Sequence, residues 1–219
     1  MPSERLLPEM VATLAVPGAT EWLALSDELL TGLVHALNNR VTAISVCAEL
    51  AGLGDEQMLR DGVLLGEVVR LQRVSAMIGL LSSQGHSEAL EIAPVLADAV
   101  EIHALHPRMR MVGCEVEVEG RVQPVRLPRW ALLRLLLIVV DAAKGGAQDA
   151  RRGAVTVRLS SDDRSVRLRT PARGSEGAYA TEMATICGGV LARVDGELQL
   201  TLPSLAELRR HEQMERPAG

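Results

Sequence analysis

One histidine and two asparagines interrupt an apolar helical repeat in the stretch Leu33-Val-His-Ala-Leu-Asn-Asn-Arg-Val-Thr-Ala-Ile44. At about 100° per residue, His35 lies roughly 200° from both Leu33 and Leu37, so its imidazole is expected to face outward. Asn39 lies one turn later on the same side as His35. A neutral imidazole is a nucleophile, so this pair is positioned to do chemistry on another molecule.

Two long helices must position this pair. The first runs from about Thr20 to Gly52, and the second starts near Asp55, a plausible N-cap, and ends at Leu81 before a polar run. They form an antiparallel hairpin, and because one hairpin cannot cover its own apolar stripe, two copies are expected to pair as the four-helix bundle of a homodimer. The first helix is expected to use an apolar seam of Leu30, Leu33, Leu37, Val41, Ile44 and Ala48.

Composition narrows the class of protein. The chain has 219 residues, 47% of them hydrophobic but only 1% aromatic, so aliphatic side chains must build the core. The net charge of -5 argues against a nucleic-acid partner held by phosphate contacts. Three widely spaced cysteines argue against a disulfide framework and indicate a reducing, cytoplasmic location. The longest aliphatic run, 135–140, is too short to span a membrane.

The remaining sequence predicts a second unit. Helices are expected near 93–103, 131–144 and 179–187, and strands near 114–119, 154–159, 166–169, 190–194 and 197–202, with Asp195-Gly196 as a hairpin turn. The fold class is therefore α+β, an antiparallel helical hairpin followed by an α/β sandwich. We divide the chain into a lead-in at 1–19, a hairpin at 20–84, a sandwich at 88–204 and a tail at 205–219.

The order of these parts resembles the catalytic core of sensor histidine kinases, in which a dimerisation and phosphoacceptor hairpin precedes a nucleotide-binding domain. His35-Ala-Leu-Asn-Asn39 resembles the kinase phosphoacceptor box. The helix 132–144 resembles the asparagine-box helix of the nucleotide domain, and 186–194 with 198–203 resembles its closing strands. The resemblance covers about residues 20–203 and implies a histidine-kinase-type sandwich.

The departures from the kinase pattern fall on the nucleotide chemistry. Ala36 stands where kinases carry an acidic residue thought to act as the base for autophosphorylation. Leu137 and Asp141 stand where the family has two asparagines, and an aliphatic side chain cannot ligate magnesium. Thr170-Pro-Ala-Arg-Gly174 replaces the adenine-binding loop and lacks its aspartate and first glycine. The sandwich is therefore expected to be degenerate, with no cofactor bound and no kinase activity.

A kinase-like protein without nucleotide chemistry resembles the dimeric phosphotransferases of phosphorelays. This resemblance implies that the protein relays phosphoryl groups between the aspartates of response-regulator receiver domains. His35 would be the phosphoacceptor, and the receiver would hold the Mg²⁺. Asn39 matches the kinase position that orients water for dephosphorylation, so it can position water or the phosphoryl group. Arg40 can contact a regulator, or it can be a solvated surface arginine. The alternative function is a non-catalytic pseudokinase scaffold that binds a kinase or a regulator.

Other polar residues have simpler explanations. His103 and His106 with Cys114 could suggest a metal site, but a His-Pro-Arg turn followed by a buried strand cysteine explains them more economically, so we predict no metal. Asp141 is read as a remnant or a helix-end polar residue, since its expected partners are absent. Ser82, Ser83 and His86 form no recognisable nucleophile arrangement.

Overall fold

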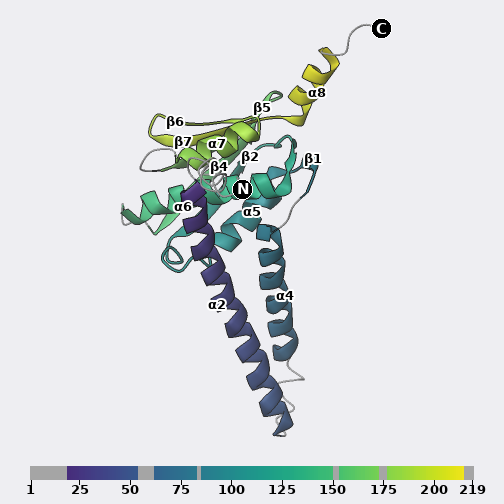
Figure 1. Ribbon diagram of the computed structural model, residues 1–219, viewed down its shortest axis with the longest axis vertical. Helices are drawn as coiled ribbons and strands as arrows, with labels where there is room; N and C mark the ends of the chain where they lie inside the picture. The colour runs from purple at the N-terminus through teal and green to yellow at the C-terminus, as the bar shows by residue number, and fades with distance from the viewer. Residues whose placement is uncertain (1–18, 54–61, 83–84, 150–152, 173–176, 215–219) are drawn as a thin grey trace, which may run out of the picture.

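Two long helices extend together from one end of a unit in which helices pack on a sheet (Figure 1). This computed structural model describes residues 19–53, 62–82, 85–149, 153–172 and 177–214. The helices of the described residues are α2 (Ala19–Gly52), α4 (Val63–Ser82), α5 (Ile92–His103), α6 (Arg129–Asp149), α7 (Ala178–Ile186) and α8 (Leu205–Met214). The strands are β1 (Ser87–Leu90), β2 (Gly113–Glu119), β3 (Val125–Pro128), β4 (Ala154–Ser161), β5 (Ser165–Pro171), β6 (Val190–Val194) and β7 (Glu197–Pro203).

The α+β class is confirmed, but the sheet is mixed. Five strands pair in the order β2-β4-β5-β7-β6, with β2 parallel to β4 and the other pairs antiparallel. The parallel pair arises because β3 and α6 intervene between β2 and β4, which provides the long crossover that parallel strands need. β3 instead pairs with β1 in a separate two-stranded sheet.

The core lies between the five-stranded sheet and the helices α5, α6 and α7. Alternate residues of β4, β5 and β7 are buried, as expected for strands with one covered face. α6 is apolar around most of its circumference, because it packs on the sheet and also contacts α5 and α4. Its fully buried leucines are Leu132, Leu133, Leu135, Leu136 and Leu137.

Helix α2 buries a different stripe from the expected seam. Leu33 is buried, but Leu30, Val41 and Ala48 are exposed in the single chain. The buried positions are instead Leu25, Leu29, Leu33 and Cys47. Two apolar stripes run along this helix, and periodicity alone does not say which one faces α4. The expected N-cap of the second helix, Asp55, lies outside the described residues.

Two local features fix where the elements end. Asp195 and Gly196 both have positive φ, at 51° and 82°, which confirms the predicted tight turn between β6 and β7. The segment that we assigned as a tail begins with α8, whose first turn is capped because the Glu207 N–H donates to the Ser204 Oγ at 3.1 Å. The sequence signal for this helix is Ser204 followed three residues later by Glu207.

α2 passes very close to the loop that follows α5. A Cβ atom placed on Gly32 would lie 2.0 Å from the carbonyl oxygen of Leu105, which is impossible without movement of the backbone. Glycine is therefore required at this crossing because the two main chains touch. The contact fixes α2 against the sandwich one turn before His35.

Candidate functional site

His35 lies on the exposed surface of α2, with Asn39 exposed one turn further along the helix. Within the described part of the chain, no hydrogen bond or ion pair involves the His35 side chain. Ala36, which follows His35, is half-buried against the core. The structure therefore presents the imidazole and the Asn39 amide to solvent side by side, and neither is committed elsewhere in the described chain.

Arg40 has a different position from its two neighbours. Its Nη1 donates to the Glu67 Oε2 of α4 at 3.0 Å, and Arg70 also pairs with the Glu67 carboxylate. Glu67 is only 7% exposed. The hydrogen bond from Arg40 is the main reason that the pKa of Glu67 lies below its usual range, with burial acting in the opposite direction. Arg40 thus ties α2 to α4 five residues after His35.

Leu137 and Thr170, the two residues that the sequence resemblance compares with kinase nucleotide ligands, are both buried. Leu137 of α6 is completely buried among aliphatic side chains. Thr170 is also completely buried, and its hydroxyl donates to the Thr156 carbonyl at 3.1 Å, so its polar group is used within the sheet. Residues 173–176 of the expected loop lie outside the described residues.

The N-terminal turns of α2 cover α6 and α7. Trp22 stacks on Tyr179 of α7, with 6.1 Å between ring centroids, and the Glu21 carboxylate accepts from the Tyr179 N–H at 3.3 Å. The guanidinium of Arg134 on α6 lies 5.1 Å from the ring centroids of both Trp22 and Trp130. These two tryptophans, which sequence reasoning passed over, join the hairpin to the sandwich.

His103 and His106 are buried next to each other, but their neighbour is Asp141 and not Cys114. The two imidazole rings stack with centroids 5.0 Å apart. His103 Nε2 lies 2.9 Å from the Asp141 Oδ1, and His106 Nε2 lies 2.8 Å from the Glu28 Oε2. Glu28 belongs to α2, so this cluster also bridges the hairpin and the sandwich. Its fourth member was not visible in the sequence, because Glu28 is nearly eighty residues away.

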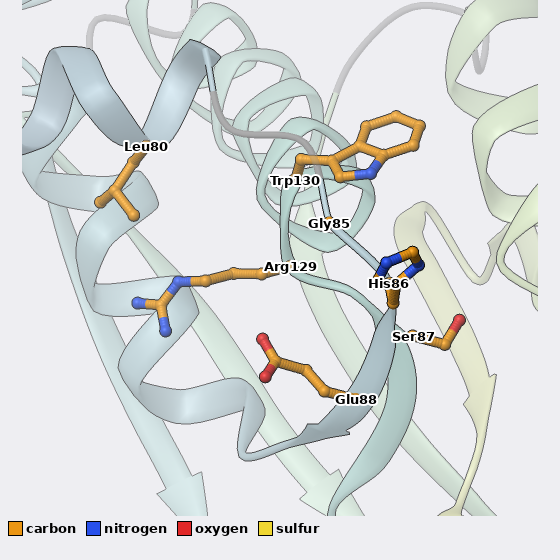
Figure 2. Close-up of a pocket in the computed structure, with 7 residues that line it drawn as sticks. All are labelled: Leu80, Gly85, His86, Ser87, Glu88, Arg129 and Trp130. Carbon is orange, nitrogen blue, oxygen red and sulfur yellow. The ribbon is translucent and has the colours of Figure 1, made fainter.

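A cavity of about 360 Å³ lies where α4 gives way to β1 (Figure 2). The guanidinium of Arg129 and the carboxylate of Glu88 point into it, with His86 and Trp130 at its upper side. The Arg129 guanidinium also donates to Asp98 at 2.7 Å, so it is neutralised within the fold. None of the residues expected for the site lines this cavity.

No known protein family matches the sequence, and no curated protein is similar to it. Among solved structures, a histidine kinase of Acinetobacter baumannii, AdeS, aligns over 78% of this chain and 96% of its own, at 14% identity and TM-score 0.41. The mycobacterial sensor histidine kinase MprB aligns over 54% and 97%, at 19% identity and TM-score 0.42. A bacterial phosphotransferase aligns over 82% and 95%, at 16% identity and TM-score 0.40. At these TM-scores the likeness in shape is partial.

None of the helices within the described ranges combines the length and the apolar character needed to cross a bilayer.

Proposed function

We propose that this protein is a histidine phosphotransferase of a two-component phosphorelay, in which His35 carries the phosphoryl group and no ATP is used. One combination of observations carries this proposal. His35 and Asn39 are exposed on α2, whereas Leu137 and Thr170 of the sandwich are buried. A nucleophile is presented to a partner, whereas the positions that would hold a nucleotide are filled.

The proposed reaction is reversible transfer between two kinds of protein. An imidazole nitrogen of His35 attacks the phosphorus of an aspartyl phosphate on a receiver domain. The new N–P bond forms as the P–O bond to the carboxylate breaks, and the carboxylate leaves with the electron pair. Mg²⁺ bound by the receiver neutralises the charge on the transferred oxygens. The reverse sequence with a second receiver completes the relay in the cytosol.

Arg40 acts in this proposal as a positioning residue. Its guanidinium is held by Glu67, so it sets how α2 lies against α4 beside the histidine. Asn39 is exposed one turn after His35 and can orient the phosphoryl oxygens or a water molecule. Loss of Asn39 is therefore expected to slow dephosphorylation of a receiver more than it slows transfer.

A second apolar stripe on α2 supports the proposed homodimer. Leu23, Leu30, Val34 and Val41 are exposed in the single chain, and on a helix of about 100° per residue they fall within roughly 40° of one another. α4 adds exposed Leu65 and Val69. Exposed apolar side chains on two adjacent helices are costly in water and fit a four-helix bundle formed with a second copy.

Transfer from a phosphorylated receiver tests the proposal. Purified protein incubated with phosphorylated receiver domains and Mg²⁺ is expected to acquire label, and the His35→Ala variant is expected to acquire none. His86→Ala is the matched control, because His86 is also exposed but belongs to neither helix of the hairpin. Wild-type protein that stays unlabelled with every receiver of the same organism would overturn phosphoryl transfer.

The alternative, a scaffold without phosphate chemistry, predicts a different pattern. Receivers would still bind to the hairpin, but the His35→Ala variant would retain full biological activity. Calorimetry with an ATP analogue and Mg²⁺ distinguishes the phosphotransferase and the scaffold from an active kinase. We expect no heat of binding, because neither Leu137 nor Thr170 can serve as a ligand for the magnesium or the base.

A further inference from the structure

The histidine cluster between α2, α5 and α6 has the composition of a metal site. His103 ends α5 and is 0% exposed, and His106 follows in the next turn and is 2% exposed. Asp141 of α6 and Glu28 of α2 bring carboxylates to the two rings. Two imidazoles and two carboxylates are a common ligand set for zinc and related divalent ions.

The distances within the cluster are close to those of a coordinated ion. One ligand atom from each of His103, His106 and Asp141 can be chosen so that all three lie within 4.8 Å of one another. The His106 Nε2 lies 4.0 Å from the Asp141 Oδ1 and 2.8 Å from the Glu28 Oε2. In a tetrahedral zinc site, ligand atoms about 2.0–2.1 Å from the ion are about 3.3 Å apart. Small side-chain movements would bring His103, His106 and Asp141 to this spacing, and the Glu28 carboxylate would approach the ion from its contact with His106.

Burial makes the two histidines hard to explain by packing alone. The His103 Nδ1 is buried without a hydrogen-bond partner among the described residues. An aliphatic side chain at this position would fill the core without leaving a polar atom unsatisfied, as the neighbouring positions of α5 do. A metal ion would bind the Nε2 atom of His103, which faces Asp141, and the ring proton would then lie on Nδ1. It is the burial of two polar rings side by side that favours a ligand role.

We propose that His103, His106 and Asp141, with Glu28 as the fourth ligand, bind a divalent transition-metal ion of the zinc class. The carboxylates are only partly buried, at 31% and 26% side-chain exposure, so an ion can enter from their side. The site is independent of phosphoryl transfer and uses none of its residues.

Coordination would rearrange the hydrogen bonds of the cluster. The Arg108 N–H points to the His106 Nδ1 at 3.3 Å, which places the ring proton of the metal-free protein on Nε2. Metal binding moves that proton to Nδ1, so the turn at 106–108 must open slightly. Arg108, which also pairs with Glu28, is exposed and can turn to solvent.

A nearby cation limits the affinity of the site. Lys144 is buried beside Asp141, and its burial lowers the pKa of the ammonium group. A bound ion would favour the neutral amine further, because two positive charges would share one apolar environment. The ion would in turn connect α2 to α5 and α6, on the face of α2 that also carries His35 seven residues later.

Calorimetric titration of the EDTA-treated full chain with Zn²⁺ tests the proposal. We expect one ion per chain in the wild type. The Asp141→Asn variant should bind at least about tenfold more weakly, although its amide oxygen can still accept from His103. His86→Ala and His211→Ala are matched controls with unchanged affinity, because both residues are exposed and outside the cluster. Equal affinity in wild type and Asp141→Asn, or loss of binding in either control, would overturn the site.

Folding of each variant is checked by circular dichroism. If Asp141→Asn does not fold, Glu28→Gln takes its place, since Glu28 is on a helix surface, and unchanged Zn²⁺ affinity in that variant would count against the proposal. Co²⁺ gives a separate readout on the wild type. Visible absorption typical of four-coordinate nitrogen and oxygen ligands is expected, and a spectrum of hexahydrated Co²⁺ would contradict the assigned ligands.

Discussion

Trp22 of the hairpin stacks on Tyr179 of the sandwich at an interplanar angle of 19°. The two residues are far apart in sequence, on the first helix of the described chain and on a helix of the sandwich. The guanidinium of Arg134 lies over the rings of both Trp22 and Trp130, so it extends the contact to Trp130. The position of α2 on the sandwich, and with it the position of His35, depends on this aromatic group.

Replacing Trp22 by alanine should loosen this contact. Loss of a large ring that is half-buried against the core is expected to lower the free energy of unfolding by about 2 kcal/mol or more. Met111→Ala is the matched control, because Met111 is 82% exposed and lies outside the proposed dimer stripe, so its removal should cost little. Urea denaturation followed by circular dichroism measures both, and equal losses would contradict the role of Trp22.

Gly32 and Gly66 should respond in opposite directions to alanine. Both lie in helices, where alanine is favoured over glycine by about 1 kcal/mol. Nothing lies within 4 Å of a Cβ at Gly66, so Gly66→Ala should raise the thermal midpoint. Gly32→Ala should lower it, because overpacking against the Leu105 carbonyl costs about 1–3 kcal/mol. Stabilisation by both substitutions would show that α2 does not pass this close to the loop.

The ion pair between Arg40 and Glu67 should make stability depend on pH. Because the pKa of folded Glu67 is lowered, its contribution is fully present above the usual glutamate pKa and is lost as pH falls through the lowered value. Arg40→Ala should reduce stability near pH 7 and flatten this acid-side dependence. Urea midpoints from pH 3 to pH 7 measure the effect. Arg121→Ala is the control, since Arg121 is exposed and far along the chain from Glu67.

A charge on the exposed stripe of α2 should separate the proposed dimer. Val41→Asp places a carboxylate at a position that is 49% exposed in the single chain, so the monomer should fold normally. Light scattering is expected to show a dimer for wild type and a monomer for the variant. Val194→Asp, at a similarly exposed position on β6, should remain dimeric. Dissociation by the control but not by Val41→Asp would place the interface elsewhere.

Cys187 should be almost inert to alkylation in the folded protein. It is buried, and burial raises the pKa of its thiol to about 11. At pH 8 roughly one thiol in a thousand would be the reactive thiolate. Mass spectrometry after treatment with iodoacetamide should find Cys187 unmodified in native protein and modified in guanidinium chloride. Rapid labelling in the native state would show that the end of α7 opens readily.

Sequence reasoning reached the hairpin and the α+β class because both rest on local patterns. The Leu and Val spacing of α2 and the Asp195-Gly196 turn are signals that neighbouring residues determine. The mixed sheet was missed, because the sequence does not show that β2 pairs with β4 across a long connection. The exposure of His35 was derived from its angle to Leu33 and is observed.

The long-range contacts of the site could not be anticipated. Arg40 reads as a surface cation until α4 places Glu67 beside it. His103 and His106 were grouped with Cys114 because the three lie near one another in sequence, whereas the fold brings Asp141 and Glu28 to them. The sequence spacing of Trp22 and Trp130 does not predict that they lie close together. They are joined in the fold by the guanidinium of Arg134, which lies over both rings.

The crossing at Gly32 supports α2 against the sandwich close to His35. The polar, aromatic and main-chain contacts of this helix with the sandwich described above, at Glu21, Trp22, Glu28 and Gly32, all come before His35. His35 lies three residues past Gly32, about 4.5 Å along the axis. A support this close along the helix sets the position of His35 relative to the sandwich. If His35 accepts a phosphoryl group as proposed, the partner protein would meet a nucleophile whose place on the surface is fixed by the sandwich.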